Sequence, residues 1–198
     1  MTAESLFVAL GVSAGVIQLI GYGLYLVLNR SSTNTGSWLI WALSAFFDLF
    51  SYEYITGGDI IKNILPAVCA LACVLTFLIL LYRRQFGSPD RVDWYFVVAD
   101  GAISALWWLS LLDGLTANLL LQATTLTAVI PMARGLLAGV DREHLLPWQL
   151  WFTAYVLHTL SVTTRLNHWS ELAYPLTNAC SCLIIITIVV RMKFKAGV

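Results

Sequence analysis

The chain has 198 residues, of which 59% are hydrophobic and only 11% are charged. Soluble domains carry about 25% charged residues, so this composition is typical of a membrane protein. The formal net charge is zero, which argues against a nucleic-acid partner because no basic surface is available to neutralise phosphates.

Runs of about 20 apolar residues are long enough to cross a bilayer, and polar breaks divide this chain into seven such segments. We expect them at 5–28, 37–55, 61–82, 93–112, 115–138, 147–164 and 172–191. The weakest break is Asp113-Gly114, where the fourth and fifth segments nearly fuse. The sequence therefore predicts an all-α membrane protein with seven transmembrane helices.

The distribution of Lys and Arg predicts the orientation, because cytoplasmic loops carry an excess of both. With the N-terminus outside, only Lys62 and Arg165 fall on the outer side. The inner side receives the other basic residues, namely Arg30, Arg83, Arg84, Arg91, Arg134, Arg142, Arg191, Lys193 and Lys195. We expect an N-out, C-in protein of the plasma membrane, and the compactness of the chain suggests a bacterial inner membrane.

Two Trp-x-x-Trp pairs, Trp38/Trp41 and Trp148/Trp151, recur with an offset of 110 residues. The same offset aligns further positions, namely Ile20-Gly21 with Ile130-Pro131, Leu26 with Leu136 and Ser51 with Ser161. This pattern predicts two parallel three-helix repeats, 1–84 and 114–198, joined by a loop and linker helix at 85–113. Duplicated membrane units are common among transporters.

The three-one-three arrangement resembles the SWEET, PQ-loop and nicotinamide riboside transporter superfamily. Ile130-Pro131 looks like the proline site in the first helix of a PQ-loop repeat. The Trp38–Trp41 segment is similar to a Trp-x-x-Trp segment of the vitamin transporters, and Asn178 could match an asparagine of the sugar transporters. The resemblance implies a seven-helix transporter and leaves its substrate open.

Two ionisable residues are expected near the bilayer midplane, where a charge is costly and usually functional. Asp48 follows Trp38 by ten residues, about 15 Å along a helix, and the repeat offset aligns Asp48 with His158. We expect the two to face each other across a central pathway, where they bind a polar substrate jointly or relay a proton. The alternative is structural: Asp48 caps a neighbouring helix and His158 bonds to a backbone carbonyl. Asp100 in the linker is a third relay candidate, or else it pairs with a Ser or Thr of the fifth segment.

The aromatic and amide residues supply the remaining candidates for substrate contact. Trp41 and Trp151 lie one turn deeper than Trp38 and Trp148, where their rings could stack on a sugar or heterocycle. Trp38 and Trp148 themselves are expected in the interfacial aromatic belt. The predicted substrate-binding set is completed by Gln18, Tyr22, Gln122 and Asn178.

Other residues suggest hinges or packing surfaces. Prolines within or at the ends of segments free backbone carbonyls, so Pro66, Pro131 and Pro175 are hinge candidates. The first segment has a small-residue face (Gly11, Gly15, Gly21 and Gly23) that predicts close helix packing and offers one surface for a homo-oligomer. The cysteines Cys69, Cys73, Cys180 and Cys182 are expected to be buried thiols, and Glu53, Arg165 and Glu171 to be solvated.

The favoured function is a facilitator or proton-coupled transporter for a small polar molecule such as a sugar, nucleoside or vitamin. One alternative is an accessory membrane protein that gates a partner. An intramembrane enzyme is a weaker alternative, because no HExxH, GxSxG or clustered His/Asp motif is present; we expect no catalytic residue, metal site or cofactor. A retinal-type receptor is set aside because every Lys lies at a segment end.

Overall fold

The computed structural model describes residues 2–29, 33–87 and 91–196, so Arg30, one of the predicted cytoplasmic residues, lies outside the described ranges. Within these ranges the chain is helical and forms no β-strand beyond the isolated bridge between Thr33 and Phe86. The helices are α1 (Ala3–Leu28), α2 (Thr35–Thr56), α3 (Ile60–Tyr82), α4 (Arg91–Trp108), α5 (Gly114–Thr127), α6 (Val129–Leu137), α7 (Leu145–Thr164), the 3₁₀ helix η1 (Trp169–Leu172) and α8 (Ala173–Ala196).

Short polar residues set several of the helix ends. The side chains of Asn34, Asp59 and Asp113 accept backbone N–H groups in the first turns of α2, α3 and α5, as N-cap residues do. At the end of α2, Gly57 adopts a left-handed conformation with φ of 63°, which glycine tolerates better than other residues. The weak break predicted at Asp113-Gly114 is therefore a capped helix start.

Four helical segments are long and apolar enough to cross a membrane: Ala3–Leu28, Ile60–Tyr82, Gly114–Leu137 and Trp169–Phe194. This confirms an all-α protein of membrane type. Helices α2, α4 and α7, with 22, 18 and 20 residues, do not meet the same standard of apolarity. The count of seven spans and their orientation stay predictions.

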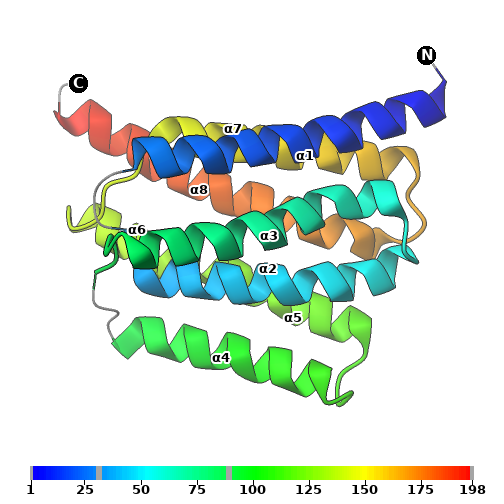
Figure 1. Ribbon diagram of the computed structural model, residues 1–198, viewed down its shortest axis with the longest axis horizontal. Helices are drawn as coiled ribbons and strands as arrows, with labels where there is room; N and C mark the ends of the chain where they lie inside the picture. The colour runs from blue at the N-terminus through cyan, green and yellow to red at the C-terminus, as the bar shows by residue number, and fades with distance from the viewer. Residues whose placement is uncertain (1, 30–32, 88–90, 197–198) are drawn as a thin grey trace.

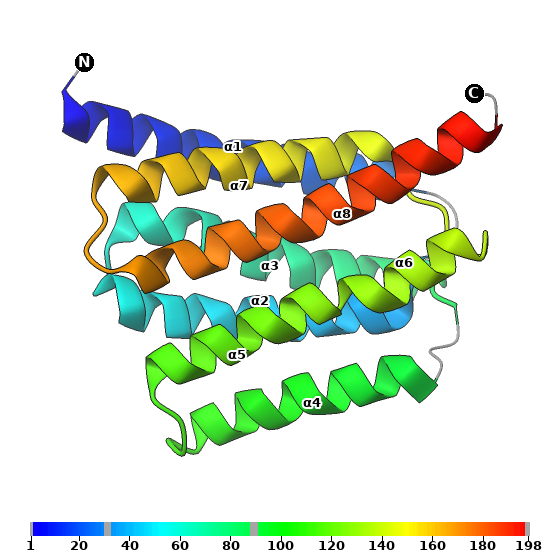
Figure 2. The same ribbon diagram turned by 180° about the vertical axis from the view of Figure 1, so that it is seen from behind.

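The helices pack in a closed ring in the order α1, α3, α2, α5, α8 and α7, and α7 returns to α1. Helix α4 lies outside this ring, where it packs mainly on α2 and α5, and it forms the edge of the molecule in Figures 1 and 2. Helix α6 continues from α5 after Ala128 and packs on α8 and α2. Two helices that are opposite each other in the ring, α2 and α7, have little direct backbone packing.

The two ends of the bundle are distinguished by the chain termini, which lie at opposite ends of the long axis (Figure 1). We call them the N-terminal end, where α1 begins, and the C-terminal end, where α8 finishes. Helices α2 and α7 begin at the C-terminal end, and α3 begins at the N-terminal end.

Three of the four glycines on α1 allow close helix contact, as the small-residue face predicted. A Cβ atom at Gly11 would lie 2.6 Å from Cγ2 of Ile61, and one at Gly21 would lie 2.5 Å from Nε1 of Trp151. Gly15 meets α3 in the same way as Gly11. At Gly23 no atom lies within 4 Å of the added Cβ, so this glycine is not needed for packing.

We predict that Gly11→Ala destabilises the protein, because the carbonyl oxygen of Ile61, 3.3 Å from the added methyl group, cannot move aside as a side chain can. Overpacking of this kind costs about 1–3 kcal/mol. The matched control Gly23→Ala adds a methyl group in open space and should be neutral or stabilising by up to about 1 kcal/mol, since alanine favours the helix. Thermal unfolding of both variants in detergent checks the prediction. A Gly11→Ala protein as stable as Gly23→Ala would contradict it.

Candidate functional site

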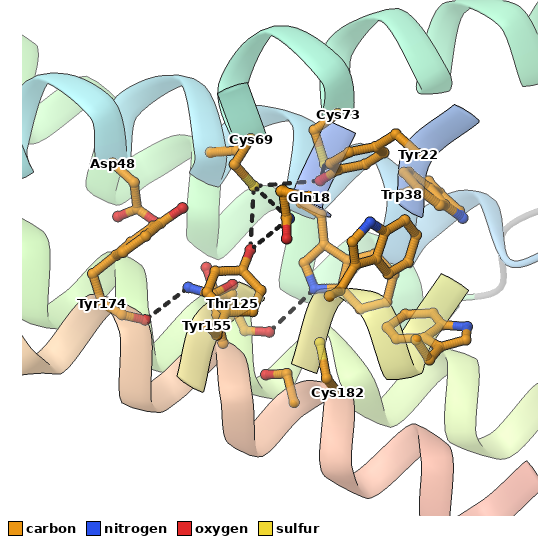
Figure 3. Close-up of a pocket in the computed structure, with 16 residues that line it drawn as sticks. Gln18, Tyr22, Trp38, Asp48, Cys69, Cys73, Thr125, Tyr155, Tyr174 and Cys182 are labelled. Carbon is orange, nitrogen blue, oxygen red and sulfur yellow. Dashed lines mark hydrogen bonds between the residues drawn. The ribbon is translucent and has the colours of Figure 1, made fainter. Parts of the chain in front are cut away.

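A cavity of about 50 Å³ lies at the centre of the ring, with room for a few water molecules. We call it the central cavity, and Figure 3 shows its walls. Side chains from α1, α2, α3, α5, α7 and α8 line it: Gln18, Tyr22, Trp38, Trp41, Ala45, Asp48, Cys69, Cys73, Thr125, Trp148, Trp151, Tyr155, Tyr174, Asn178, Ser181 and Cys182.

Most residues predicted to bind substrate are brought together around this cavity. Those that line it are Gln18, Tyr22, Trp41, Asp48, Trp151 and Asn178. Gln122 does not line the cavity, but its Nε2 donates a hydrogen bond of 2.9 Å to Oδ1 of Asp48. Its Oε1 accepts a bond of 3.5 Å from Asn178. An acid and two amides therefore form a connected polar group on one side of the bundle centre.

His158, which the repeat offset pairs with Asp48, does not line the cavity. Its ring is buried, with its centroid 6.2 Å from those of Tyr52 and Tyr174. Neither ring nitrogen has a hydrogen-bond partner among the described residues, so the predicted alternative, a bond to a backbone carbonyl, is absent there too. Tyr174 lines the cavity, and His158 packs against this tyrosine.

Asp100 is also buried away from the cavity. One carboxylate oxygen accepts hydrogen bonds of 2.7 Å from the hydroxyl groups of Ser44 on α2 and Thr124 on α5. Asp100 thereby ties the outer helix α4 to the ring. This is the structural alternative anticipated for the residue, a bond to a Ser or Thr of the fifth segment.

The two Trp-x-x-Trp pairs meet in one cluster, which we call the tryptophan tetrad. Its ring centroids form a closed cycle: Trp38 to Trp41 at 5.7 Å, Trp41 to Trp148 at 5.6 Å, Trp148 to Trp151 at 4.9 Å and Trp151 to Trp38 at 6.3 Å. All four contacts are edge-to-face, a geometry that stabilises an aromatic pair by about 0.5–1.5 kcal/mol beyond burial.

The placement of Trp38 and Trp148 corrects an expectation. Both were assigned to the interfacial belt, but they are 1% and 3% exposed. The physical reason is that α2 and α7 lie opposite each other in the ring, and large rings fill the space between their backbones. Trp94 and Trp169, at 52% and 59% exposed, keep the outward position that a belt residue has.

A cluster of thiol and phenol groups forms another wall of the cavity. The hydroxyl of Tyr22 lies 3.3 Å from Sγ of both Cys69 and Cys73, and the hydroxyl of Tyr155 lies 3.3 Å from Cys69 (Figure 3). This cluster was not predicted from the sequence. The one-turn spacing of the two cysteines, which places them on one helix face, was the available signal. Cys180 is exposed on α8, so the expectation that all four thiols are buried is wrong there.

Glu143 joins three segments at the C-terminal end of the bundle and was not singled out from the sequence. Its carboxylate accepts hydrogen bonds from Tyr25 (2.9 Å) and Asn29 (2.7 Å) of the first segment, from Thr33 (2.8 Å) and from Trp148 (3.0 Å). Because Trp148 belongs to the tetrad, this group, the Glu143 cluster, connects the tetrad to the loops. Burial raises the pKa of Glu143 even though four donors favour its charged form.

The raised pKa of Glu143 predicts a pH-dependent stability. The folded state holds the proton more tightly than the unfolded chain does, so the stabilisation is present at low pH and is lost as the pH rises above the ordinary value of 4.5 and through the folded-state pKa. Glu143→Gln cannot ionise and should show a flatter pH profile of the unfolding midpoint. The variant should also be less stable at pH 5. The amide nitrogen that replaces one carboxylate oxygen cannot accept the hydrogen bonds that this oxygen receives in the unmodified protein.

The neighbouring Asp141 supplies a comparison for that measurement. Burial, and then the nearby Asp93, raise the pKa of Asp141 from 3.8 to about 6. Asp141→Asn should therefore remove the part of the pH dependence that falls between pH 3.8 and about 6 and leave the part due to Glu143. Thermal unfolding between pH 4.5 and 8 measures both, and a Glu143→Gln profile as steep as that of the unmodified protein would contradict the assignment.

A buried ion pair lies at the N-terminal end of the bundle. Nζ of Lys62 on α3 is 2.6 Å from Oε2 of Glu171 in η1, and both side chains are 0% exposed. Tyr52 on α2 donates a hydrogen bond of 2.8 Å to the backbone carbonyl of Glu171. The expectation that Glu171 is solvated is therefore wrong: η1 folds back over the helix ends and carries this carboxylate inside.

We predict that Lys62→Met costs about 3–5 kcal/mol of stability, because it leaves the Glu171 carboxylate buried without its partner. The double variant Lys62→Met/Glu171→Leu should recover most of that loss, since no uncompensated charge is left. The exposed pair of Arg165 and Glu4, 48% and 66% exposed, is the control: Glu4→Gln should change stability by about 1 kcal/mol or less. Chemical unfolding in detergent distinguishes these cases, and equal destabilisation by the single and double variants would overturn the prediction.

The three hinge candidates have different surroundings. Pro66 lies inside α3, and Pro131 lies in α6, close to the break from α5 at Ala128. Pro175 lies in the first turn of α8, directly after η1. A helix tolerates proline in its first turn because those N–H groups have no partner within the helix. Of the three, Pro131 lies nearest to an interruption between two helices, the one between α5 and α6 at Ala128.

Comparisons with protein-family models, with curated proteins and with solved structures found no match to this chain. Among the described residues, no three His, Cys, Asp or Glu side chains come together as metal ligands do.

Proposed function

We propose that this protein is a membrane transporter, a facilitator or a proton-coupled carrier, for a small polar molecule. The observation that carries the proposal is the position of the central cavity. It lies in the middle of a ring of apolar helices and is walled by side chains from six of them. Binding sites of transporters lie near the bilayer midplane between repeated helix bundles, and the depth of Asp48 in α2 agrees with such a position.

The proposal includes the seven-span, three-one-three architecture, with the N-terminus outside and a plasma-membrane location. The packing order supports it: exchanging α1 with α5, α2 with α7 and α3 with α8 turns the ring of contacts into itself. This is the exchange that the offset of 110 residues predicts. The peripheral place of α4, mainly against α2 and α5, suits a linker helix. On this architecture alone we extend the resemblance to the SWEET and PQ-loop superfamily.

The Glu143 cluster and the Lys62–Glu171 pair suggest how access to the cavity would alternate. In the proposed orientation the Glu143 cluster and the tryptophan tetrad lie on the cytoplasmic side, and the Lys62–Glu171 pair lies on the outer side. Opening the cytoplasmic side would separate the groups of the Glu143 cluster, and opening the outer side would separate Lys62 from Glu171. In each state the polar contacts of the other side would stay intact and keep that side closed. Such rocking of one bundle against the other is the usual mechanism of repeat transporters.

We predict that Asp48→Asn abolishes solute uptake by reconstituted proteoliposomes, because it removes the one carboxylate that lines the cavity. A thermal-shift screen of the purified protein against sugars, nucleosides, B vitamins and amino acids would choose the solutes, and their labelled forms would then be measured in liposomes. Asp100→Asn is the matched control: Asp100 is equally buried but lies outside the cavity, so uptake should persist.

Protein-free liposomes set the background for this experiment, and circular dichroism shows that both variants fold. If the unmodified protein and the Asp48→Asn variant take up solute equally well, the central cavity is not the transport site. Failure of every solute class to bind or to cross would contradict the transporter proposal itself.

A further inference from the structure

The charge of the central cavity is one-sided. Asp48 is its single acidic lining residue, and none of the described residues that line it is Lys, Arg or His. Oδ1 of Asp48 accepts the bond from Gln122, whereas Oδ2 has no hydrogen-bond partner among the described residues. Lys62 is buried as well, but it is paired with Glu171. A buried carboxylate that lacks a cationic partner is costly, so the cavity favours the arrival of a positive charge.

The remaining walls favour a cation for a separate reason. Four tryptophans and three tyrosines line the cavity, and the faces of aromatic rings carry negative electrostatic potential. Aromatic cages of this composition bind substituted ammonium groups through cation–π attraction. Tyr174 lies beside Asp48, and Trp38 lies at the other end of the cavity (Figure 3), so aromatic surface extends along its length.

Solutes of other charge fit this wall less well. An anion would approach Asp48 without any cationic side chain to offset the repulsion. A neutral solute could bond to Gln18 or Asn178, both of which line the cavity, but it would leave the charge of Asp48 uncompensated. A cation satisfies both the free carboxylate oxygen and the aromatic faces.

We propose that the central cavity binds a small organic cation, with its substituted or protonated nitrogen beside Asp48 and its apolar part towards the tryptophan tetrad. This inference rests on the proposed function, because it names the solute class of the same cavity. The present cavity of about 50 Å³ holds only a few water molecules, so binding requires the rings to move apart. Trp41, the tetrad member that is only partly buried, is the ring best placed to do so.

The test uses probes of the same shape that differ in charge. Choline is compared with 3,3-dimethylbutan-1-ol and 3,3-dimethylbutanoate, which replace the quaternary nitrogen by carbon and, in the acid, add a negative charge. A second set, 2-phenylethylammonium, 2-phenylethanol and phenylacetate, covers a larger cation. Binding to the purified full-length protein is measured by tryptophan fluorescence and by the shift of the thermal unfolding midpoint.

We expect at least one cation to bind at least tenfold more tightly than its neutral counterpart, and the anions to bind most weakly. Asp48→Asn should remove this preference, Asp48→Glu should restore it, and Asp100→Asn should leave it unchanged. The charge preference of the unmodified protein is itself decisive, so the test does not depend on whether a variant folds. Equal binding of cation and neutral analogue, or the absence of binding by both cations, would overturn the inference.

The outcomes also separate this inference from the proposed function. If neutral sugars or nucleosides bind and enter proteoliposomes while the organic cations do neither, the transporter proposal stands and the cation proposal fails. If the cations bind with the expected preference and are not transported, the cavity is a cation receptor site and the transporter proposal fails. Absence of binding by every solute tested contradicts both.

Discussion

The packing of four tryptophan rings between α2 and α7 is the constraint on which the rest of the site depends. These two helices lie opposite each other in the ring, and their backbones do not pack closely. The tetrad bridges them through two ring contacts, Trp41 to Trp148 at 5.6 Å and Trp38 to Trp151 at 6.3 Å, and Trp148 extends the contact to the Glu143 carboxylate. The rings therefore join the two halves of the molecule and at the same time form one wall of the central cavity.

Polar groups inside an apolar bundle are stable only where they find partners, and two clusters of partnered groups lie at its two ends. Glu143 is held by four side-chain donors, and Lys62 is held by Glu171. Between these clusters some capacity is left over: one oxygen of Asp48 and both nitrogens of His158 lack partners among the described residues. These atoms without partners lie in and beside the cavity, where a bound solute could form hydrogen bonds with them.

Much of the cavity wall could be predicted from the chain, because a fixed spacing on a helix determines which side chains share a face. The spacing of Trp38 and Asp48 and the offset of the two Trp-x-x-Trp pairs indicated residues that line the same cavity. The same reasoning failed where it assumed perfect symmetry. His158 packs against Tyr174 and does not line the cavity. Glu143 and Glu171 lie in short connections, whose path no periodicity describes. Trp38 and Trp148 are tryptophans near segment ends, as belt residues are, and only the tertiary packing around them shows that they are buried.

The sequence by itself determined the helical segments, most of their ends and the apolar character of the chain. These follow from local causes, namely hydrophobic run length, capping residues and glycine. Tertiary structure alone decided which polar groups meet: Glu143 with Tyr25, Lys62 with Glu171, and Asp48 with Gln122. The physical reason is that such contacts join residues far apart in the chain. The sequence pattern indicates how far along a helix a residue lies, but it does not indicate how one helix is rotated against another.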